Sequence, residues 1–313
     1  MSTTSKSPRK VAKVAMEVGK EALPDYSNRY SPKKFTQSQL FACLVLKEFL
    51  KTDYRGIVDH LADNPTLCQD MELKRIPHWT TVQKAGKRLL RNANVQRLLS
   101  ETITRARPRS RSKHRTQIAK SALDATGFET HHTSHYFVRR KASGGSSWQK
   151  TTYKRFPKLA VLCRCDNHMI LAAVPGRGPK PDITHFNRAL KEASDRAMLQ
   201  TLYADAGYDA EWVHKTARKE RGVRTVIPPK AGRPTDKPPT GHWRRVMHDR
   251  IHLTSYGQRW QDETVFSMMK RRLGSALNAR SYWSQCRALM LKALVHNIMI
   301  LYALMQILYK PSS

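Results

Sequence analysis

The sequence predicts a mixed α/β domain, with a mixed sheet flanked by helices, preceded by an all-helical module. Two observations support this fold class. Between residues 36 and 99, apolar residues such as Leu40, Cys43 and Leu44 recur at helical spacing. After residue 117, short apolar runs bounded by glycine, proline or aspartate alternate with amphipathic segments, which is typical of strands and helices in one mixed sheet.

The first part of the chain divides into three regions. Residues 1–30 are polar and basic with little periodicity, so we expect a flexible basic N-terminus. Residues 31–104 contain three or four short helices, a unit of the size of a helix-turn-helix DNA-binding module. Residues 105–117 include the run RARPRSRSKHR, whose like charges oppose compact packing, so we expect a basic linker.

Residues 118–313 have the mixed pattern and form the expected α/β domain. Three strands come first, and a tight turn at Asp166-Asn167-His168 joins the second to the third, so the sheet opens with an antiparallel meander. We expect strands at 122–129, 158–165, 169–176, 201–207 and 223–229, and helices at 182–197, 211–222, 256–272 and 284–309.

The charge of the chain points to a polyanionic partner. The sequence has 57 Lys and Arg against 24 Asp and Glu, a formal net charge of +33 and a pI near 10.4. Such a chain repels itself unless a polyanion binds it, and DNA or RNA fits better than the rival, an anionic membrane surface. The cations are dense at 105–115, 215–250 and 270–272, which favours a long nucleic-acid track over one basic arm.

The cysteines and the apolar segments indicate a cytoplasmic protein. The five cysteines are odd in number and scattered, so no disulfide framework is expected, and Cys163 and Cys165 are expected to pack in the core rather than bind metal. The N-terminus has no apolar stretch of the kind that a secretory signal needs. Residues 288–309 are hydrophobic enough to suggest a membrane span, but polar residues such as Lys292 and Asn297 interrupt them, so we expect a buried core helix.

One segment combines a carboxylate with cations at helical spacing. Tyr256, Arg259, Glu263 and Lys270 stand at offsets 0, 3, 7 and 14, within an arc of about 60° on one face of an α-helix. A carboxylate so placed can hold a divalent metal while the phenol and the cations contact phosphates. Arg259 and Glu263 also have the i,i+4 spacing of an ordinary helix-stabilising ion pair, and both interpretations stay open from spacing alone.

Two aspartates occupy expected strands next to glycines. Asp124 lies in ALDATGFE and Asp205 follows the apolar TLYA and precedes Gly207. A sheet fixes such a carboxylate and the glycine lets a phosphate approach, so both are candidate metal ligands. If Asp124, Asp205 and Glu263 converge, they repel strongly without a cation, and two divalent ions would be natural occupants. Three other aspartates are expected only to cap or turn the chain: Asp166, Asp182 and Asp209.

Aromatic residues and a histidine cluster offer weaker signals. Trp243 and Trp260 lie among arginines and could stack on an unpaired base, although packing is the more common role. His131, His132 and His135 lack a fourth ligand in a polar segment, so we expect a solvated or DNA-facing loop rather than a metal site.

Taken together, these motifs resemble a known family. Asp124 in ALDATGFE, Asp205 in YADAGYD and the Tyr-x2-Arg-x3-Glu-x6-Lys pattern at 256–270 look like the DDE transposases of bacterial insertion sequences. Within them, the resemblance is to the class with the YREK signature, as in insertion-sequence families four and five. It covers roughly residues 35–309.

The resemblance implies a ribonuclease H-like catalytic domain in which Asp124, Asp205 and Glu263 bind two Mg²⁺ ions, for which Mn²⁺ can substitute. In that family, water attacks the phosphate at the transposon end, and the freed 3′-hydroxyl then attacks target DNA. Tyr256 and Arg259 would hold phosphates near the cleaved bond and Lys270 would contact the DNA end. The remaining DNA-binding residues expected on this segment are Trp260 and Arg271.

The implied partners are double-stranded DNA, as inverted-repeat transposon ends and as target, and a second copy of the chain in an active homodimer. We expect no membrane partner and a cytoplasmic, nucleoid-associated protein. Two alternatives remain. One is a ribonuclease H-like nuclease that hydrolyses DNA without joining strands. The other is a domesticated DNA-binding protein that has lost catalysis, against which the intact acidic triad argues.

Overall fold

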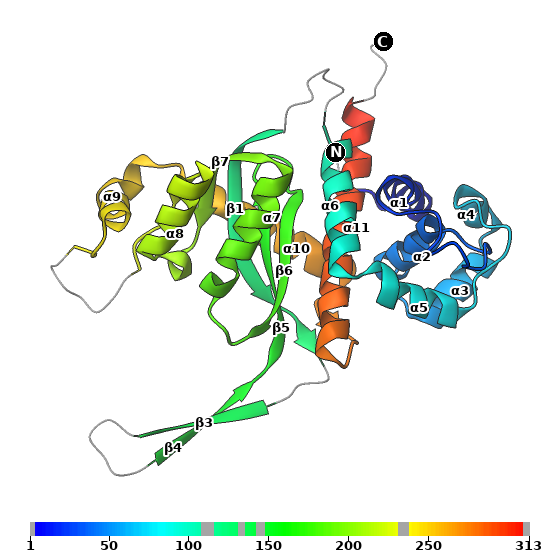
Figure 1. The fold of residues 1–313 in the computed structure, drawn as a ribbon, viewed down its shortest axis with the longest axis horizontal. Helices are drawn as coiled ribbons and strands as arrows, with labels where there is room; N and C mark the ends of the chain where they lie inside the picture. Colours follow the sequence, from blue (N-terminus) through cyan, green and yellow to red (C-terminus); the bar gives the residue numbers. More distant parts are fainter. Residues whose placement is uncertain (1–3, 108–115, 131–134, 142–147, 231–237, 309–313) are drawn as a thin grey trace.

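A five-stranded mixed sheet lies at the centre of the protein, with helices on both faces (Figure 1). The computed structural model describes residues 4–107, 116–130, 135–141, 148–230 and 238–308. The strand order is β6 (Ile170–Gly178), β5 (Phe156–Arg164), β1 (Gln117–Gly127), β7 (Met198–Ala204) and β8 (Arg224–Val226). β6, β5 and β1 pair antiparallel, whereas β1, β7 and β8 pair parallel, which confirms the mixed sheet and its opening meander.

One face of the sheet is covered by the helices that connect its parallel strands. α7 (Phe186–Arg196) follows the 3₁₀ turn η1 (Asp182–His185) and leads into β7. α8 (Glu211–Lys215) continues into the π-helical turn η3 (Thr216–Glu220) and leads into β8. Apolar residues of α7 and α8, among them Phe186, Leu190 and Val213, pack with Leu123 and Leu202 of the sheet into a hydrophobic cluster.

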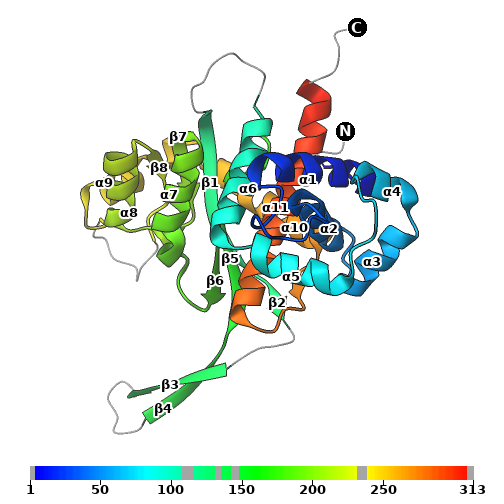
Figure 2. The same cartoon turned by 45° about the vertical axis from the view of Figure 1, so that its right-hand side comes forward.

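The other face is covered by α10 (Trp260–Leu273), α11 (Tyr282–Leu308) and the N-terminal helices (Figure 2). These helices and that face of the sheet share one hydrophobic cluster. The N-terminal helical region is present as expected, and whether residues 31–104 act as a separate DNA-binding unit stays a prediction. Its helices are α1 (Pro8–Ala22), α2 (Gln37–Phe49), α3 (Tyr54–Ala62), α4 (Pro65–Asp70), α5 (Trp79–Leu89) and α6 (Asn92–Arg105).

The expectation of a flexible N-terminus is wrong for most of residues 4–30. Ser7 caps α1, Pro8 occupies its first turn, and Val11, Val14 and Val18 are buried against the neighbouring helices. The lysines and alanines of this segment favour a helix and its three valines favour it less, so burial of the valines against neighbouring helices adds to local preference in stabilising α1. The expected basic linker falls mainly on residues 108–115, which lie outside the described residues.

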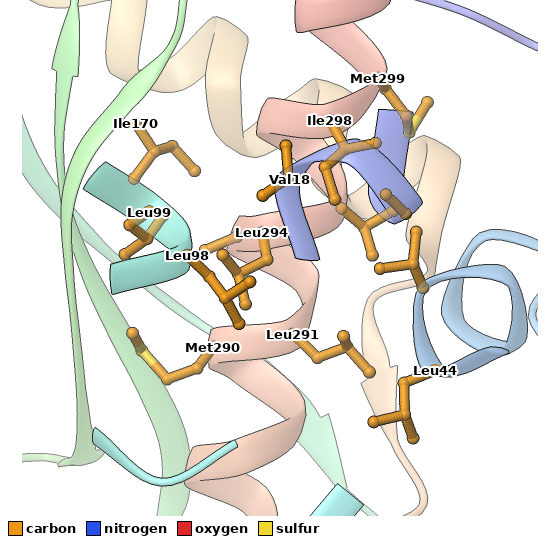
Figure 3. Close-up of a cluster of buried hydrophobic side chains, with 14 of the residues drawn as sticks. Val18, Leu44, Leu98, Leu99, Ile170, Met290, Leu291, Leu294, Ile298 and Met299 are labelled. Atoms are coloured by element: carbon orange, nitrogen blue, oxygen red, sulfur yellow. The ribbon is translucent and has the colours of Figure 1, made fainter. Parts of the chain in front are cut away.

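α11 is the central helix of the larger cluster, as expected for a core helix. Figure 3 shows Leu291, Leu294 and Ile298 of α11 between Val18 of α1 and Leu99 of α6, with Leu44 of α2 and Ile170 of β6 at the edges. Among the described residues, Tyr282–Met305 alone is helical, long and apolar enough to cross a membrane, and 72% of its most apolar window is buried within the protein. A helix buried in a protein core can be just as long and just as apolar as a membrane span.

Three features of the described fold were not expected. The first is α9 (His242–Arg250), which follows β8 in the chain. The second is the parallel pairing of β2 (Glu129–Thr130) with β9 (Ala276–Leu277). The third is a ribbon of β3 (His135–Lys141) and β4 (Trp148–Lys154), which pair antiparallel and extend away from the body of the protein in both views (Figures 1 and 2).

Candidate active site

The sheet register places Asp124 and Asp205 side by side. β1 and β7 are parallel neighbours in which Leu123 pairs with Ala204, so the next residue on each strand is one of the two aspartates. Parallel strands bring their carboxyl ends to the same edge of a sheet, which is where ligands bind in open α/β folds. The two acids expected from sequence are therefore neighbours in the fold.

Asp124 is largely buried and its carboxyl group is perturbed. Its side chain is 17% exposed, and its Oδ1 accepts a 2.7 Å hydrogen bond from the amide of Ala125. Burial raises the pKa of Asp124 to about 6; the Ala125 hydrogen bond and the Arg259 charge oppose this shift, and the charge of Asp205 adds to it. A cation bound next to Asp124 would therefore lower the free energy of its charged carboxylate.

Asp205 begins a short turn that requires the glycine after it. Its Oδ1 accepts a 2.9 Å hydrogen bond from the amide of Gly207 in the 3₁₀ turn η2 (Ala206–Tyr208). A Cβ atom at position 207 would lie 2.9 Å from that same oxygen, a distance that side chains essentially never show. The glycine keeps the backbone amide close to the carboxylate, and whether it also lets a phosphate approach stays a prediction.

The segment with Tyr256 and Glu263 is not one continuous α-helix, which corrects the expectation. Tyr256 and Arg259 form the 3₁₀ turn η5 (Tyr256–Arg259), and α10 starts at Trp260. Arg259 Nη2 lies 2.8 Å from Oε1 of Glu263, and its Nη1 lies 3.7 Å from Oδ2 of Asp124. Burial raises the pKa of Tyr256; the charge of Arg259 opposes this shift, and the charges of Asp205, Asp124 and Glu263 add to it.

The other expected DNA-binding residues lie along or beside α10. Lys270 Nζ donates a 2.8 Å hydrogen bond to Oγ1 of Thr126, which shares a face of β1 with Asp124. Its ammonium also lies 5.5 Å from the ring centroid of Phe128. Arg271 and Trp260 are exposed, the indole to 68%.

The weaker aromatic and histidine signals have mixed outcomes. Trp243 is only partly exposed and packs against the guanidinium of Arg218 at 4.3 Å, which fits the packing role. His135 is an exposed residue of β3, whereas His131 and His132 lie outside the described residues.

Sequence reasoning missed a buried acid next to Glu263. Asp262 is completely buried, its Oδ1 accepts a 2.9 Å hydrogen bond from the Cys163 thiol, and its Oδ2 has no hydrogen-bond partner. Burial raises the pKa of Asp262 well above its usual range. Asp262 and Glu263 are adjacent in a helix and point about 100° apart. Cys163 packs in the core, as expected, and its thiol donates a hydrogen bond to one of the two oxygens of this carboxyl group.

Asp182 was expected only as a cap or turn residue, and it has a further role. It begins η1, forms an ion pair with Lys158, and its charge is among those that raise the pKa of Asp124. No local sequence pattern indicates that Asp182 lies near Asp124, because only the tertiary structure brings η1 close to β1.

The donor atoms available here are carboxylate oxygens, which hard divalent cations prefer. Asp124 and Asp205 fit such an ion because their negative charges repel each other, and a cation between them would relieve that repulsion. Within the described residues, Arg259 is the one cation paired with Asp124. No three His, Cys, Asp or Glu side chains in this described part lie close enough to hold one ion together. Glu263 is instead paired with Arg259, so it can join the other two acids only after leaving the guanidinium.

A basic groove lies beyond the C-terminal end of α10, and it was not expected. It has a volume of about 590 Å³ and runs between the N-terminal helices and the segment 273–280. Lys51 of this groove donates a 3.1 Å hydrogen bond to the carbonyl of Arg271, which joins the helical region to α10. Five of its lining cations come from regions distant in sequence: Lys47, Lys51, Lys87, Arg280 and Arg287.

Comparison with known proteins identifies the domain that holds these residues. A family model described as the transposase DDE domain matches residues 115–298, which include both strand aspartates, Glu263 and Lys270. No curated protein among those compared matches the chain.

Proposed function

The chain belongs to the transposase DDE domain family, whose model covers more than half of it, and from this premise we propose that it binds transposon ends, cleaves them and transfers the freed strand to target DNA. The observation that supports this most directly is that Asp124, within β1, and Asp205, just after the parallel strand β7, are neighbours, with Arg259 and Glu263 beside them. We further propose a ribonuclease H-like domain and membership of the YREK class of insertion-sequence transposases.

In the proposed site, Asp124, Asp205 and Glu263 hold two Mg²⁺ ions. The bound ions supply Lewis acidity at the scissile phosphate and activate the attacking water. The remaining work falls to this chain's own side chains. Arg259 releases Glu263 and turns its planar guanidinium to the phosphate, which it can grip with two hydrogen bonds.

Tyr256 and Lys270 position the DNA in this proposal. The phenol of Tyr256, which is close enough to the three acids for their charges to raise its pKa, donates a hydrogen bond to a phosphate oxygen and so fixes the strand near them. The ammonium of Lys270 exchanges its Thr126 contact for a phosphate at the DNA end. Trp260 and Arg271 are exposed beside them and extend the contact surface. The active form is proposed to be a homodimer on paired ends in the bacterial nucleoid.

The proposal is tested by incubating labelled DNA with the element's own ends, in Mg²⁺ or EDTA. The variants are the wild type, Glu263→Gln and the matched control Asp195→Asn. The control is apt because Asp195, like Glu263, is an exposed helical acid (55% against 56%) in an i,i+4 ion pair.

Metal-dependent 3′-end cutting with joined products, lost in Glu263→Gln and kept in Asp195→Asn, is the expected result. Cutting without joined products would indicate a nuclease. Tight binding with no cutting in any divalent metal would indicate a DNA-binding protein without catalysis. Full cleavage by Glu263→Gln would remove that residue from the proposed triad.

A further inference from the structure

The β3–β4 ribbon has no place in the core of the protein. β3 and β4 form their own two-stranded sheet, separate from the central one. They leave the domain between β1 and β5 and extend into solvent (Figures 1 and 2). An isolated two-stranded ribbon is marginally stable in water, so a ribbon that is not hydrogen-bonded to the central sheet is a candidate for stabilisation by a binding partner.

The ribbon collects positive charge on one face. Arg139 pairs across the strands with Lys150, and His135 pairs with Lys154. Paired residues share a face, as do alternate residues along a strand, so these four side chains and Trp148 stand together. All five are exposed, Trp148 to 62%.

Acidic residues are absent from this part of the sequence. There is no Asp or Glu between Glu129 and Asp166, so neither strand supplies a carboxylate to its own cations. Like charges directly opposite each other destabilise a pair of strands. Scattered lysines can protect an exposed edge from aggregation, but that purpose does not require a cationic cross-strand pair on one face. The arrangement therefore suits a polyanionic partner.

We propose that the β3–β4 ribbon enters the major groove of a DNA duplex, with Arg139 and Lys150 contacting the phosphates that border the groove. This inference rests on the proposed function for the presence of DNA. The major groove, about 12 Å wide, accepts a two-stranded β-ribbon. Strands of seven residues reach about 23 Å, enough to span the groove and both bordering backbones.

The test uses the full chain, a fluorescein-labelled 30-base-pair duplex and a KCl series, with binding followed by fluorescence anisotropy. The ribbon variant is Arg139→Gln/Lys150→Gln. The control is Arg188→Gln/Lys191→Gln, which removes the same charge from one exposed arginine and one exposed lysine of α7. The slope of log affinity against log salt is expected to fall by about two in the ribbon variant, one for each phosphate contact, and to stay unchanged in the control.

A second readout places the ribbon in the groove. Dimethyl sulfate reacts with guanine N7, which lies in the major groove, so the wild type should protect guanines that the ribbon variant leaves reactive. Arg139→Glu/Lys150→Glu should bind more weakly than the Gln variant, which distinguishes charge contact from simple loss of the ribbon's structure.

An unchanged salt slope in the ribbon variant, or no N7 protection by the wild type, would overturn the inference. So would a ribbon variant that loses only its binding to phosphatidylserine vesicles, since the partner would then be a membrane. These outcomes leave the proposed function intact if the wild type still cleaves transposon ends. A wild type that binds no duplex at all would remove both proposals.

Discussion

The guanidinium of Arg259 lies 2.8 Å from the carboxylate of Glu263, which follows it by four residues in the chain. The same guanidinium lies 3.7 Å from Asp124. In this arrangement, Arg259 supplies positive charge to two of the three proposed metal ligands. The i,i+4 contact that stabilises an ordinary helix therefore also places a guanidinium at the proposed site.

Removing this arginine should therefore strengthen metal binding by the DNA-free protein. Arg259→Gln frees Glu263 and leaves the acids without a counter-charge, so Mn²⁺ affinity is expected to rise about two- to fivefold, the value of a partly exposed ion pair. Electron paramagnetic resonance of free Mn²⁺ measures this directly. Arg188→Gln, which breaks the i,i+4 pair with Glu192 on α7, is the control and should leave affinity unchanged. Equal or weaker Mn²⁺ binding by Arg259→Gln would contradict the counter-charge role.

Asp124 should make stability depend on pH in metal-free buffer. Its folded-state pKa of about 6 lies above the ordinary value of 3.8 for an aspartate, so the fold favours the protonated form. The resulting stability is fully present below about pH 4 and is lost as pH rises through 6, with an upper bound of about 3 kcal/mol. Urea unfolding in EDTA at pH 5 and pH 7 should show a smaller difference in Asp124→Asn than in the wild type. Identical differences in the two proteins would rule out a perturbed Asp124.

Lys270 and its partner Thr126 can be separated by mutation. Lys270→Met removes the ammonium and should lower the salt slope of DNA-end binding by about one, because one phosphate contact is lost. Thr126→Val removes only the 2.8 Å hydrogen bond to Lys270 and should leave that slope unchanged. Anisotropy titrations across a KCl series measure both. If Thr126→Val lowers the salt slope as much as Lys270→Met, then Lys270 contacts the phosphate only when its hydrogen bond to Thr126 is present.

A buried ion pair joins the N-terminal helices to α11. Lys292 Nζ lies 2.7 Å from Oε1 of Glu48, and both side chains are almost inaccessible. Lys292→Met leaves the carboxylate of Glu48 buried without the ammonium of Lys292. This change should lower the free energy of unfolding by about 3–5 kcal/mol. Adding Glu48→Leu should recover most of the loss, because replacing both charges by apolar groups is close to neutral. Urea unfolding measures both variants, and a double variant as unstable as the single one would show that the lysine stabilises by other contacts.

The strands of the central sheet could be foreseen, because they show local signals, namely apolar runs that end at glycine or aspartate. Asp124 and Asp205 could be selected as candidates, but their position side by side depends on the parallel pairing of β1 with β7, which no local signal specifies. The start of α10 could not be foreseen either. A four-residue 3₁₀ turn at Tyr256–Arg259 and an α-helix give nearly the same spacing over so short a segment.

Other features were hidden because their causes lie far away in sequence. Asp262 is buried through the thiol of Cys163, 99 residues earlier, and nothing beside Asp262 in the sequence signals this. α1 is stabilised in part because Val11, Val14 and Val18 find a buried surface on other helices. The sequence of the β3–β4 ribbon lacks strict alternation of apolar residues, so the usual sign of a strand is missing.

The position of α11 has a consequence for how the protein is made. This helix follows every other element in the chain, yet it packs against α1, α2, α6 and β6, so the N-terminal helices cannot complete their core until α11 has left the ribosome. Contacts between such distant parts of the chain slow folding. Nascent chains should therefore be trapped by chaperones or degraded before α11 emerges, and the level of folded protein in the cell should respond to chaperone supply more strongly than its final stability alone suggests.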